Sequence, residues 1–175
     1  MLWLADAIEA IRDFMNLGGP VLRAIAVTIF LMWVLIVERI IFFRSSMKKM
    51  SRDIHDQWES RPERQSWNAK QIRELMISRF SDASNKGINL IQTLVALCPL
   101  LGLLGTVTGM ISVFQVMAVS GSGNVRAMAA GVSQATVPTM AGMVGALSGV
   151  LLITLLSRRA AHEVEFLEDS LTMDH

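Results

Sequence analysis

Two long runs without a charged side chain limit what this chain can fold into. The first extends from Ile88 to Val119 and the second from Ala127 to Ser157, and a short turn at residues 120–124 separates them. Each run exceeds the roughly 18 to 20 apolar residues that suffice to cross a bilayer. The pair therefore predicts a hairpin of two transmembrane helices, residues 88–157.

The composition favours an integral membrane protein over a soluble domain or an enzyme. Hydrophobic residues make up 52% of the chain, and the mean hydropathy is +0.45. The net charge of +1 comes from basic and acidic residues that lie almost entirely outside the apolar runs, and it indicates no nucleic-acid partner. No nucleophile, general base or metal-ligand cluster is apparent, so we expect no catalytic residue, no metal and no cofactor. We expect the single Cys98 to act as a small buried hydrophobe.

The first 43 residues predict a surface helix followed by a first span. Within residues 1–19, Leu4, Ile8, Ile11 and Met15 recur at helical spacing among charged residues, which is typical of an amphipathic helix lying along the membrane. Gly18-Gly19-Pro20 ends it, and residues 20–43 form the first span. At the end of this span we interpret Glu38 and Arg39 as an interfacial charge pair, in preference to a functional ion pair inside the membrane.

Residues 44–87 predict a cytoplasmic helical loop. They hold ten basic and six acidic residues, and an excess of Lys and Arg marks the cytoplasmic side. The amino terminus is then outside and periplasmic, and three spans place the carboxyl terminus in the cytoplasm. Met47, Met50, Ile54 and Trp58 predict that the first span continues as a helix. After a break at Arg61-Pro62, a second helix leads into the hairpin.

The last residues and the length of the spans complete an all-α architecture. Residues 158–175 predict a short amphipathic tail helix, with Val164, Leu167 and Leu171 on one side. The 32 residues from Ile88 to Val119 would form about 48 Å of helix against about 30 Å of hydrocarbon. The long helices therefore extend into the cytoplasm. We expect neighbouring copies or partners to cover their apolar surface, which favours an oligomer.

Small residues and prolines on the hairpin predict close helix packing and a kink. Gly105 with Gly109, and Gly145 with Gly149, each fit the GxxxG spacing that lets helix backbones approach, a weak signal by itself. Pro138 cannot donate a backbone hydrogen bond and crowds the carbonyl of Gln134, so we expect the third helix to loosen there. The full set of packing and kink candidates is Pro99, Gly102, Gly105, Gly109, Pro138, Gly142, Gly145 and Gly149.

Two threonines on the hairpin have two open interpretations. Thr106 and Thr139 lie on stripes of small and apolar residues that could line a path. Alternatively, each hydroxyl bonds the carbonyl one turn earlier in its own helix. Neither long run contains Asp, Glu, Lys or His. A proton relay normally needs an ionisable group within the membrane. Either another protein supplies that group, or this chain does not conduct protons.

These residues resemble a known family. The stretch from Pro99 to Met110, PLLGLLGTVTGM, and the stretch from Ala130 to Gly145, AGVSQATVPTMAGMVG, are similar to the characteristic hairpin of the ExbB/TolQ/MotA proton-channel family. The resemblance implies three-helix proteins of the bacterial inner membrane that form homopentamers around a central pore. That pore holds the single transmembrane helices of an ExbD-like or TolR-like partner, and proton flow through it drives work on the cell envelope.

The resemblance also implies roles for particular residues. Thr106 and Thr139 fall on the two pore-lining threonines of the family. Gln134 stands in the third span where ExbB and TolQ relatives usually carry a glutamate, which shifts the proton-binding role to an aspartate on the partner helix. Thr106, Thr139 and Gln134 are therefore the ion-pathway candidates.

The function implied is that of an inner-membrane proton-channel subunit. With an ExbD-like partner and a TonB-like protein, it would couple the proton motive force to transport across the outer membrane. The short loop between the first two spans indicates a compact ExbB-like member. A TolQ-like subunit for envelope integrity is the alternative within the family, and a MotA-like stator is disfavoured because that group adds a fourth span. From another class, a scaffold that packs without ion flux stays open.

Overall fold

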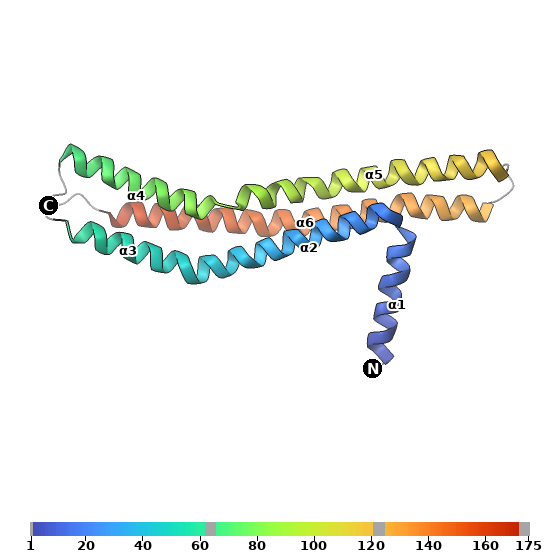
Figure 1. Cartoon of the computed structure of the whole chain (residues 1–175), viewed down its shortest axis with the longest axis horizontal. Helices are drawn as coiled ribbons and strands as arrows, with labels where there is room; N and C mark the ends of the chain where they lie inside the picture. The colour runs from blue at the N-terminus through green and yellow to red at the C-terminus, as the bar shows by residue number, and fades with distance from the viewer. Residues whose placement is uncertain (1, 62–65, 121–124, 172–175) are drawn as a thin grey trace. The chain divides into compact units, whose positions relative to one another are not determined.

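The computed structural model describes residues 2–61, 66–120 and 125–171 of the chain. In that part its regular secondary structure is helical, joined by short turns and without a β-strand (Figure 1). The elements are α1 (Leu2–Leu17), α2 (Gly19–Phe42), the π-helical turn η1 (Phe43–Met47), α3 (Lys48–Glu59), α4 (Trp67–Asn85), α5 (Ile88–Ser120) and α6 (Val125–Ser170). The all-α prediction is confirmed.

Three helical stretches are long and apolar enough to cross a membrane, which confirms the three predicted spans. They are Gly19–Glu59 with 41 residues, Trp67–Val119 with 53 and Val125–Ser170 with 46. At about 1.5 Å per residue, each is longer than the roughly 30 Å of hydrocarbon in a bilayer. Each stretch therefore extends beyond the hydrocarbon on at least one side.

Several boundaries differ from the prediction or lie outside the described residues. Residues 158–170 continue α6 without a break and do not form a separate tail helix. Likewise, α6 is helical through Pro138 and α5 through Pro99. The predicted turn at 120–124 begins at Ser120, which ends α5, and its other residues lie outside the described residues. Pro62 of the predicted break and residues 172–175 of the predicted tail also lie outside the described residues.

The chain divides into two compact units. The first comprises Met1–Trp33 and Thr93–Val150, and therefore holds α1, the start of α2, most of α5 and the start of α6. The second comprises Val34–Gln92 and Leu151–His175, and holds the end of α2, η1, α3, α4, the start of α5 and the end of α6.

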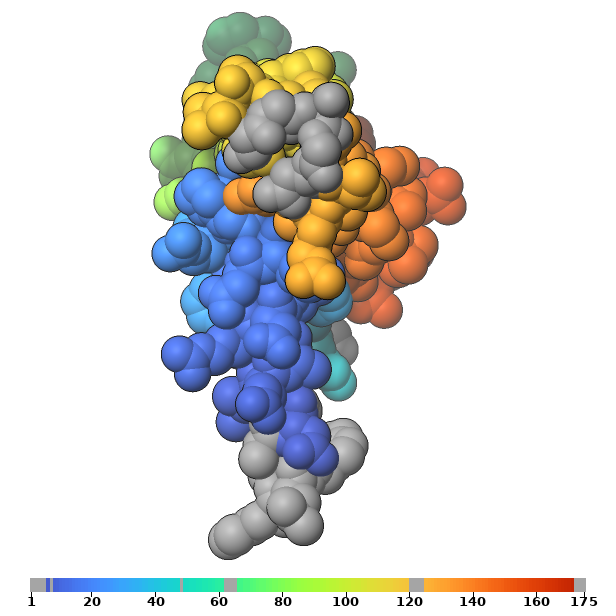
Figure 2. Space-filling model, turned by 90° about the vertical axis from the view of Figure 1, so that its right-hand side faces the viewer, coloured from blue at the N-terminus to red at the C-terminus, as the bar shows by residue number. Residues whose placement is uncertain are grey.

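In the first unit, α1 extends away from the helices beside it (Figures 1 and 2). Consequently two apolar side chains in the middle of α1 are largely exposed within the chain: Ile8 is 66% exposed and Ile11 63%. A single residue, Gly18, separates α1 from α2, and Gly19 has a φ of +66° that an L side chain rarely adopts. The predicted amphipathic helix is present, and the two glycines make its sharp turn into α2.

The second unit has a core of large apolar side chains. Met47, Ile54 and Trp58 from η1 and α3 are buried, as is Phe80 from α4. Met47, Ile54 and Trp58 belong to the stripe that predicted the continuation of the first span. Gly87 has a φ of +83° and lies between α4 and α5, where glycine provides the positive φ that commonly ends a helix.

Candidate functional site: the α5–α6 hairpin

Glycines bring the backbones of α5 and α6 into direct contact. A Cβ atom added to Gly109 would lie 2.5 Å from the Ala135 Cα, and one added to Gly142 would lie 2.5 Å from the Cys98 carbonyl oxygen. Such distances are far below van der Waals separation, so no larger residue fits without movement of the backbone. Gly102 faces Thr139 in the same interface, with 3.1 Å between the added Cβ and the Thr139 Cα.

The remaining GxxxG glycines face side chains of other helices. Gly105 lies against the ring of Pro138 on α6. On α6, Gly145 lies against Ile29 of α2, and Gly149 lies against Met32 of α2 and Val95 of α5. The packing residues thus hold three helices of one chain together. Pro99 is exposed, unlike Pro138, which is buried.

The two threonines of the hairpin use their hydroxyl groups differently. The Thr106 hydroxyl donates to the Leu103 carbonyl of its own helix at 2.7 Å. This bond fits the second interpretation, in which the hydroxyl bonds a carbonyl one turn earlier in the same helix. The Thr139 hydroxyl instead donates to the Gly102 carbonyl of α5 at 3.0 Å. Both side chains are half-buried. Their role as pore-lining residues stays a prediction.

Gln134 lies beside the junction between α1 and α2. A Cβ atom on Gly19 would lie 2.6 Å from the Gln134 Nε2, so the amide packs directly on the glycine backbone. Gln134 also lines a cavity of about 400 Å³ together with Asn16, Leu17 and Ser112. This half-buried amide is therefore placed to contact the start of the first span, a neighbour that the sequence pattern does not reveal.

The predicted charge pair of Glu38 and Arg39 is long and unevenly buried. The Arg39 Nε lies 3.9 Å from the Glu38 carboxylate, and the two side chains are 9% and 59% exposed. The guanidinium lies 5.0 Å from the centroid of the Phe42 ring, a cation–π distance. It also packs on the backbone of Gly87, and its Nε is buried without a hydrogen-bond partner. Arg39 thus contacts the Phe42 ring and the Gly87 backbone as well as the Glu38 carboxylate.

Arg73 is an interhelical contact that sequence patterns did not single out. From α4, its Nε donates to the Leu171 carbonyl at 2.8 Å and its Nη2 donates to the Glu168 carbonyl at 2.7 Å. These carbonyls lie at the end of α6, where the last turn of a helix leaves oxygen atoms unpaired. A cation there also interacts favourably with the helix dipole. Arg73 therefore caps α6.

Cys98 is buried in the α5–α6 contact. Its side chain is fully inaccessible, and its thiol donates to the Leu94 carbonyl one turn earlier at 3.3 Å. This is the small buried hydrophobe expected from the sequence. Close packing leaves no path for a reagent to reach it in the folded chain.

Comparison with known proteins gives a family match and one curated relative. The sequence model of the MotA/TolQ/ExbB proton channel family matches residues 38–169. A protein of Synechocystis sp. whose name describes an ExbB-like biopolymer transport protein is 36% identical over 84 residues, which is 46% of this chain. The aligned part spans 33% of that relative's length. No solved structure matches the chain with significance.

Proposed function

We propose a function that rests on family membership: the chain belongs to the MotA/TolQ/ExbB proton channel family. Family membership and three apolar helices of spanning length support a proton-channel role in a membrane. Our proposal is more specific. The chain is a channel subunit of the bacterial inner membrane that, with an ExbD-like partner, couples the proton motive force to TonB-dependent transport across the outer membrane.

The observation that carries the proposal is the absence of acidic and basic side chains from both hairpin spans. Residues 88–119 and 127–157 contain no Asp, Glu, Lys, Arg or His. Proton transfer across the hydrocarbon therefore needs a titratable group from elsewhere, because apolar side chains, hydroxyls and amides do not bind protons at neutral pH. A single-span partner with a membrane aspartate supplies that group, and the hairpin supplies its polar surroundings.

The uncovered apolar surface of the hairpin supports assembly around such a helix. Side chains on both helices are exposed in the single chain, among them Leu100, Leu103 and Val107 on α5 and Met143 and Leu147 on α6. Lipid covers one side of each helix, and copies of the chain cover another. A homopentamer around a central pore, as the family resemblance implies, would leave room for the partner helix.

The charge distribution supports the orientation. Residues 44–87 carry ten basic and six acidic side chains, and Arg158 and Arg159 follow the last apolar run directly. By the positive-inside rule both segments belong in the cytoplasm, and α1 then lies on the periplasmic surface.

The name of the Synechocystis relative, which describes an ExbB-like biopolymer transport protein, favours this function over a TolQ-like one. The phenotype of a strain that lacks the gene distinguishes the TonB-dependent function from the TolQ-like one. Our proposal predicts that uptake of iron–siderophore complexes falls to background while resistance to detergent is unchanged. Normal uptake together with detergent sensitivity would show a TolQ-like role. Loss of neither would favour the scaffold without ion flux.

A further inference from the structure

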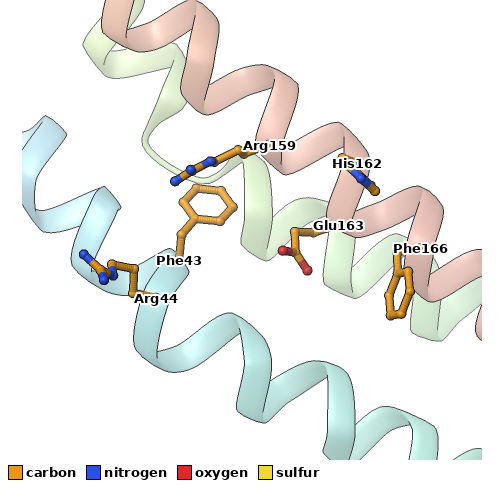
Figure 3. A pocket seen from close by; sticks show the side chains of 6 residues that line it. All are labelled: Phe43, Arg44, Arg159, His162, Glu163 and Phe166. Atoms are coloured by element: carbon orange, nitrogen blue, oxygen red, sulfur yellow. The ribbon is translucent and has the colours of Figure 1, made fainter.

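Two adjoining cavities in the second unit differ sharply in polarity. The larger, about 530 Å³, is lined by Phe43, Arg44, Arg159, His162, Glu163 and Phe166 (Figure 3). The other, about 430 Å³, is lined by Ile40, Leu152, Leu155, Leu156, Arg158, Arg159 and His162. Because Arg159 and His162 line both, the cavities adjoin. One is basic and aromatic, and the other is aliphatic with a basic rim.

The basic cavity carries charges that are not neutralised within the chain. The basic cavity is lined by Arg44 and Arg159 and by one carboxylate, that of Glu163, and Arg158 lines the adjoining aliphatic cavity, so the two linings together are positive even with His162 neutral. In the part of the chain that the structure describes, none of the three arginines forms an ion pair. All three are exposed. Figure 3 shows Arg159 extending over the Phe43 ring, whereas Glu163 lies farther along α6 toward Phe166.

The polarity change coincides with the end of the spanning segments. The uncharged run of α6 ends at Ser157, directly before Arg158 and Arg159, and the apolar residues of the first span end at Phe43, directly before Arg44. Leu155 therefore lies at the depth of the hydrocarbon, whereas Ile40, which follows the interfacial Glu38 and Arg39, and the arginines Arg44, Arg158 and Arg159 lie at its edge. Such a position exposes the basic side chains to lipid headgroups.

We propose that the two cavities together bind one anionic phospholipid. Its phosphate would lie between Arg44 and Arg159, where guanidinium groups donate charge-assisted hydrogen bonds to phosphate oxygens. One acyl chain would lie along Ile40, Leu152 and Leu155. Glu163 would accept a hydrogen bond from a headgroup hydroxyl, which suits a glycerol headgroup.

A phospholipid fits better than a second protein chain because one molecule provides both kinds of contact. The aliphatic cavity needs an apolar chain at the depth of the hydrocarbon, and the basic cavity needs a phosphate at its edge. The bilayer presents both at high local concentration. The volumes also fall within the range of about 300–1,000 Å³ that is usual for ligand sites. The proposal is independent of proton coupling.

The test measures lipid retention by the full chain, purified in detergent with any partner that co-purifies. Phosphatidylglycerol and phosphatidylcholine are titrated separately, and bound lipid is counted by native mass spectrometry. In the double variant Arg44→Gln with Arg159→Gln, the affinity for phosphatidylglycerol should fall about tenfold or more, because the charged donors of hydrogen bonds to the phosphate are removed. Arg126→Gln is the matched control, because it removes one exposed arginine from the first turn of the same helix.

The proposal predicts that Arg126→Gln retains lipid like the unmodified chain and that Arg159→Lys, which keeps the charge, retains an intermediate amount. It also predicts that phosphatidylcholine binds several-fold more weakly and that free glycerol phosphate does not compete. The proposal would be overturned if Arg126→Gln lost as much lipid as the double variant or if phosphatidylcholine were retained as well as phosphatidylglycerol. Competition by free glycerol phosphate would overturn it too. Unchanged lipid retention with an altered subunit count in the double variant would overturn it in favour of a contact between copies. Circular dichroism checks that each variant is folded.

Discussion

The Thr139 hydroxyl on α6 donates a hydrogen bond to the Gly102 carbonyl oxygen on α5. The 3.0 Å bond crosses between two helices whose backbones already touch at Gly109 and Gly142. By contrast, the Thr136 hydroxyl donates to the Val132 carbonyl of its own helix at 2.8 Å. A side chain proposed to line the channel is therefore also a link between the two helices of the hairpin.

Replacing Thr139 by Val should weaken the hairpin modestly. The change keeps the shape and removes the hydroxyl, and interhelical hydrogen bonds in membrane proteins contribute about 0.6 kcal/mol on average. We expect a loss of about 0.5–1.5 kcal/mol of unfolding free energy, measured by SDS-induced unfolding followed by circular dichroism. A bulkier residue would be a poorer probe, because it would also force apart the contact with Gly102.

Thr136→Val is the control for this change, since it removes a hydroxyl that bonds only within α6. Its expected effect is close to zero, and Thr139→Ser should retain most of the stability. A destabilisation as large in Thr136→Val as in Thr139→Val would contradict the interhelical role of the bond.

Replacing Gly109 by Ala should destabilise the hairpin strongly. The new methyl group would lie 2.5 Å from the Cα of Ala135, so the two helices must separate. Overpacking of this kind typically costs about 1–3 kcal/mol. The SDS concentration at the unfolding midpoint should fall accordingly.

Gly149→Ala provides the comparison for Gly109→Ala. Its methyl group would meet the Met32 Sδ at 2.6 Å and the Val95 Cγ2 at 2.5 Å, which are side-chain atoms. A methionine side chain can move away at little cost. We therefore expect Gly149→Ala to destabilise less than Gly109→Ala, and the reverse order would show that the backbone contact is not the tighter one.

Removing the Arg73 cap should loosen the end of α6. In Arg73→Gln the carbonyls of Glu168 and Leu171 lose their charged donor, and we expect a cost of about 1–2 kcal/mol because the site is partly exposed to solvent. Amide hydrogen exchange over residues 164–171 should become faster. Arg79→Gln, which removes an exposed arginine of the same helix, should leave this exchange unchanged.

Arg39→Met should change stability little or raise it. Among the described residues, the buried guanidinium has an unpaired Nε, and its contact to the exposed Glu38 carboxylate is long. Replacing a poorly paired buried charge by an apolar side chain of similar size is often neutral or stabilising, by about 1–4 kcal/mol in favourable cases. A loss above about 2 kcal/mol in heat-induced unfolding would indicate that an anionic partner pairs with Arg39 in the assembled protein.

The sequence predicted the helical elements well because the patterns that specify them are local. The helix of the first span was expected at 20–43, and α2 is found at Gly19–Phe42, followed by the expected helical continuation. Likewise, α5 ends at Ser120 and α6 begins at Val125, on either side of the expected turn. The tail was separated from the third span because charge begins at Arg158, yet a change in polarity does not end a helix.

The contacts of the site were harder to predict because they depend on tertiary pairing. Thr139 could have bonded its own helix, as Thr106 does, and only the close approach at Gly102 offers it another carbonyl. Gln134 meets Gly19, and Arg73 meets carbonyls almost a hundred positions away. Neither spacing nor periodicity encodes such pairs. The GxxxG spacing was a local signal that did predict close packing, but it did not show which residues each glycine would meet.

The central claim is that the hairpin forms a proton path only with a titratable group from a partner. The most direct measurement is proton flux into liposomes that contain the purified chain, with a pH-sensitive dye inside and a potassium diffusion potential across the membrane. The chain is compared alone, with a single-span ExbD-like partner bearing a membrane aspartate, and with that partner after its aspartate is changed to asparagine.

We expect background flux for the chain alone and for the chain with the asparagine partner, and clear flux only with the aspartate partner. Flux of equal size from the chain alone would contradict this expectation, because residues 88–119 and 127–157 would then conduct protons without any acidic or basic side chain.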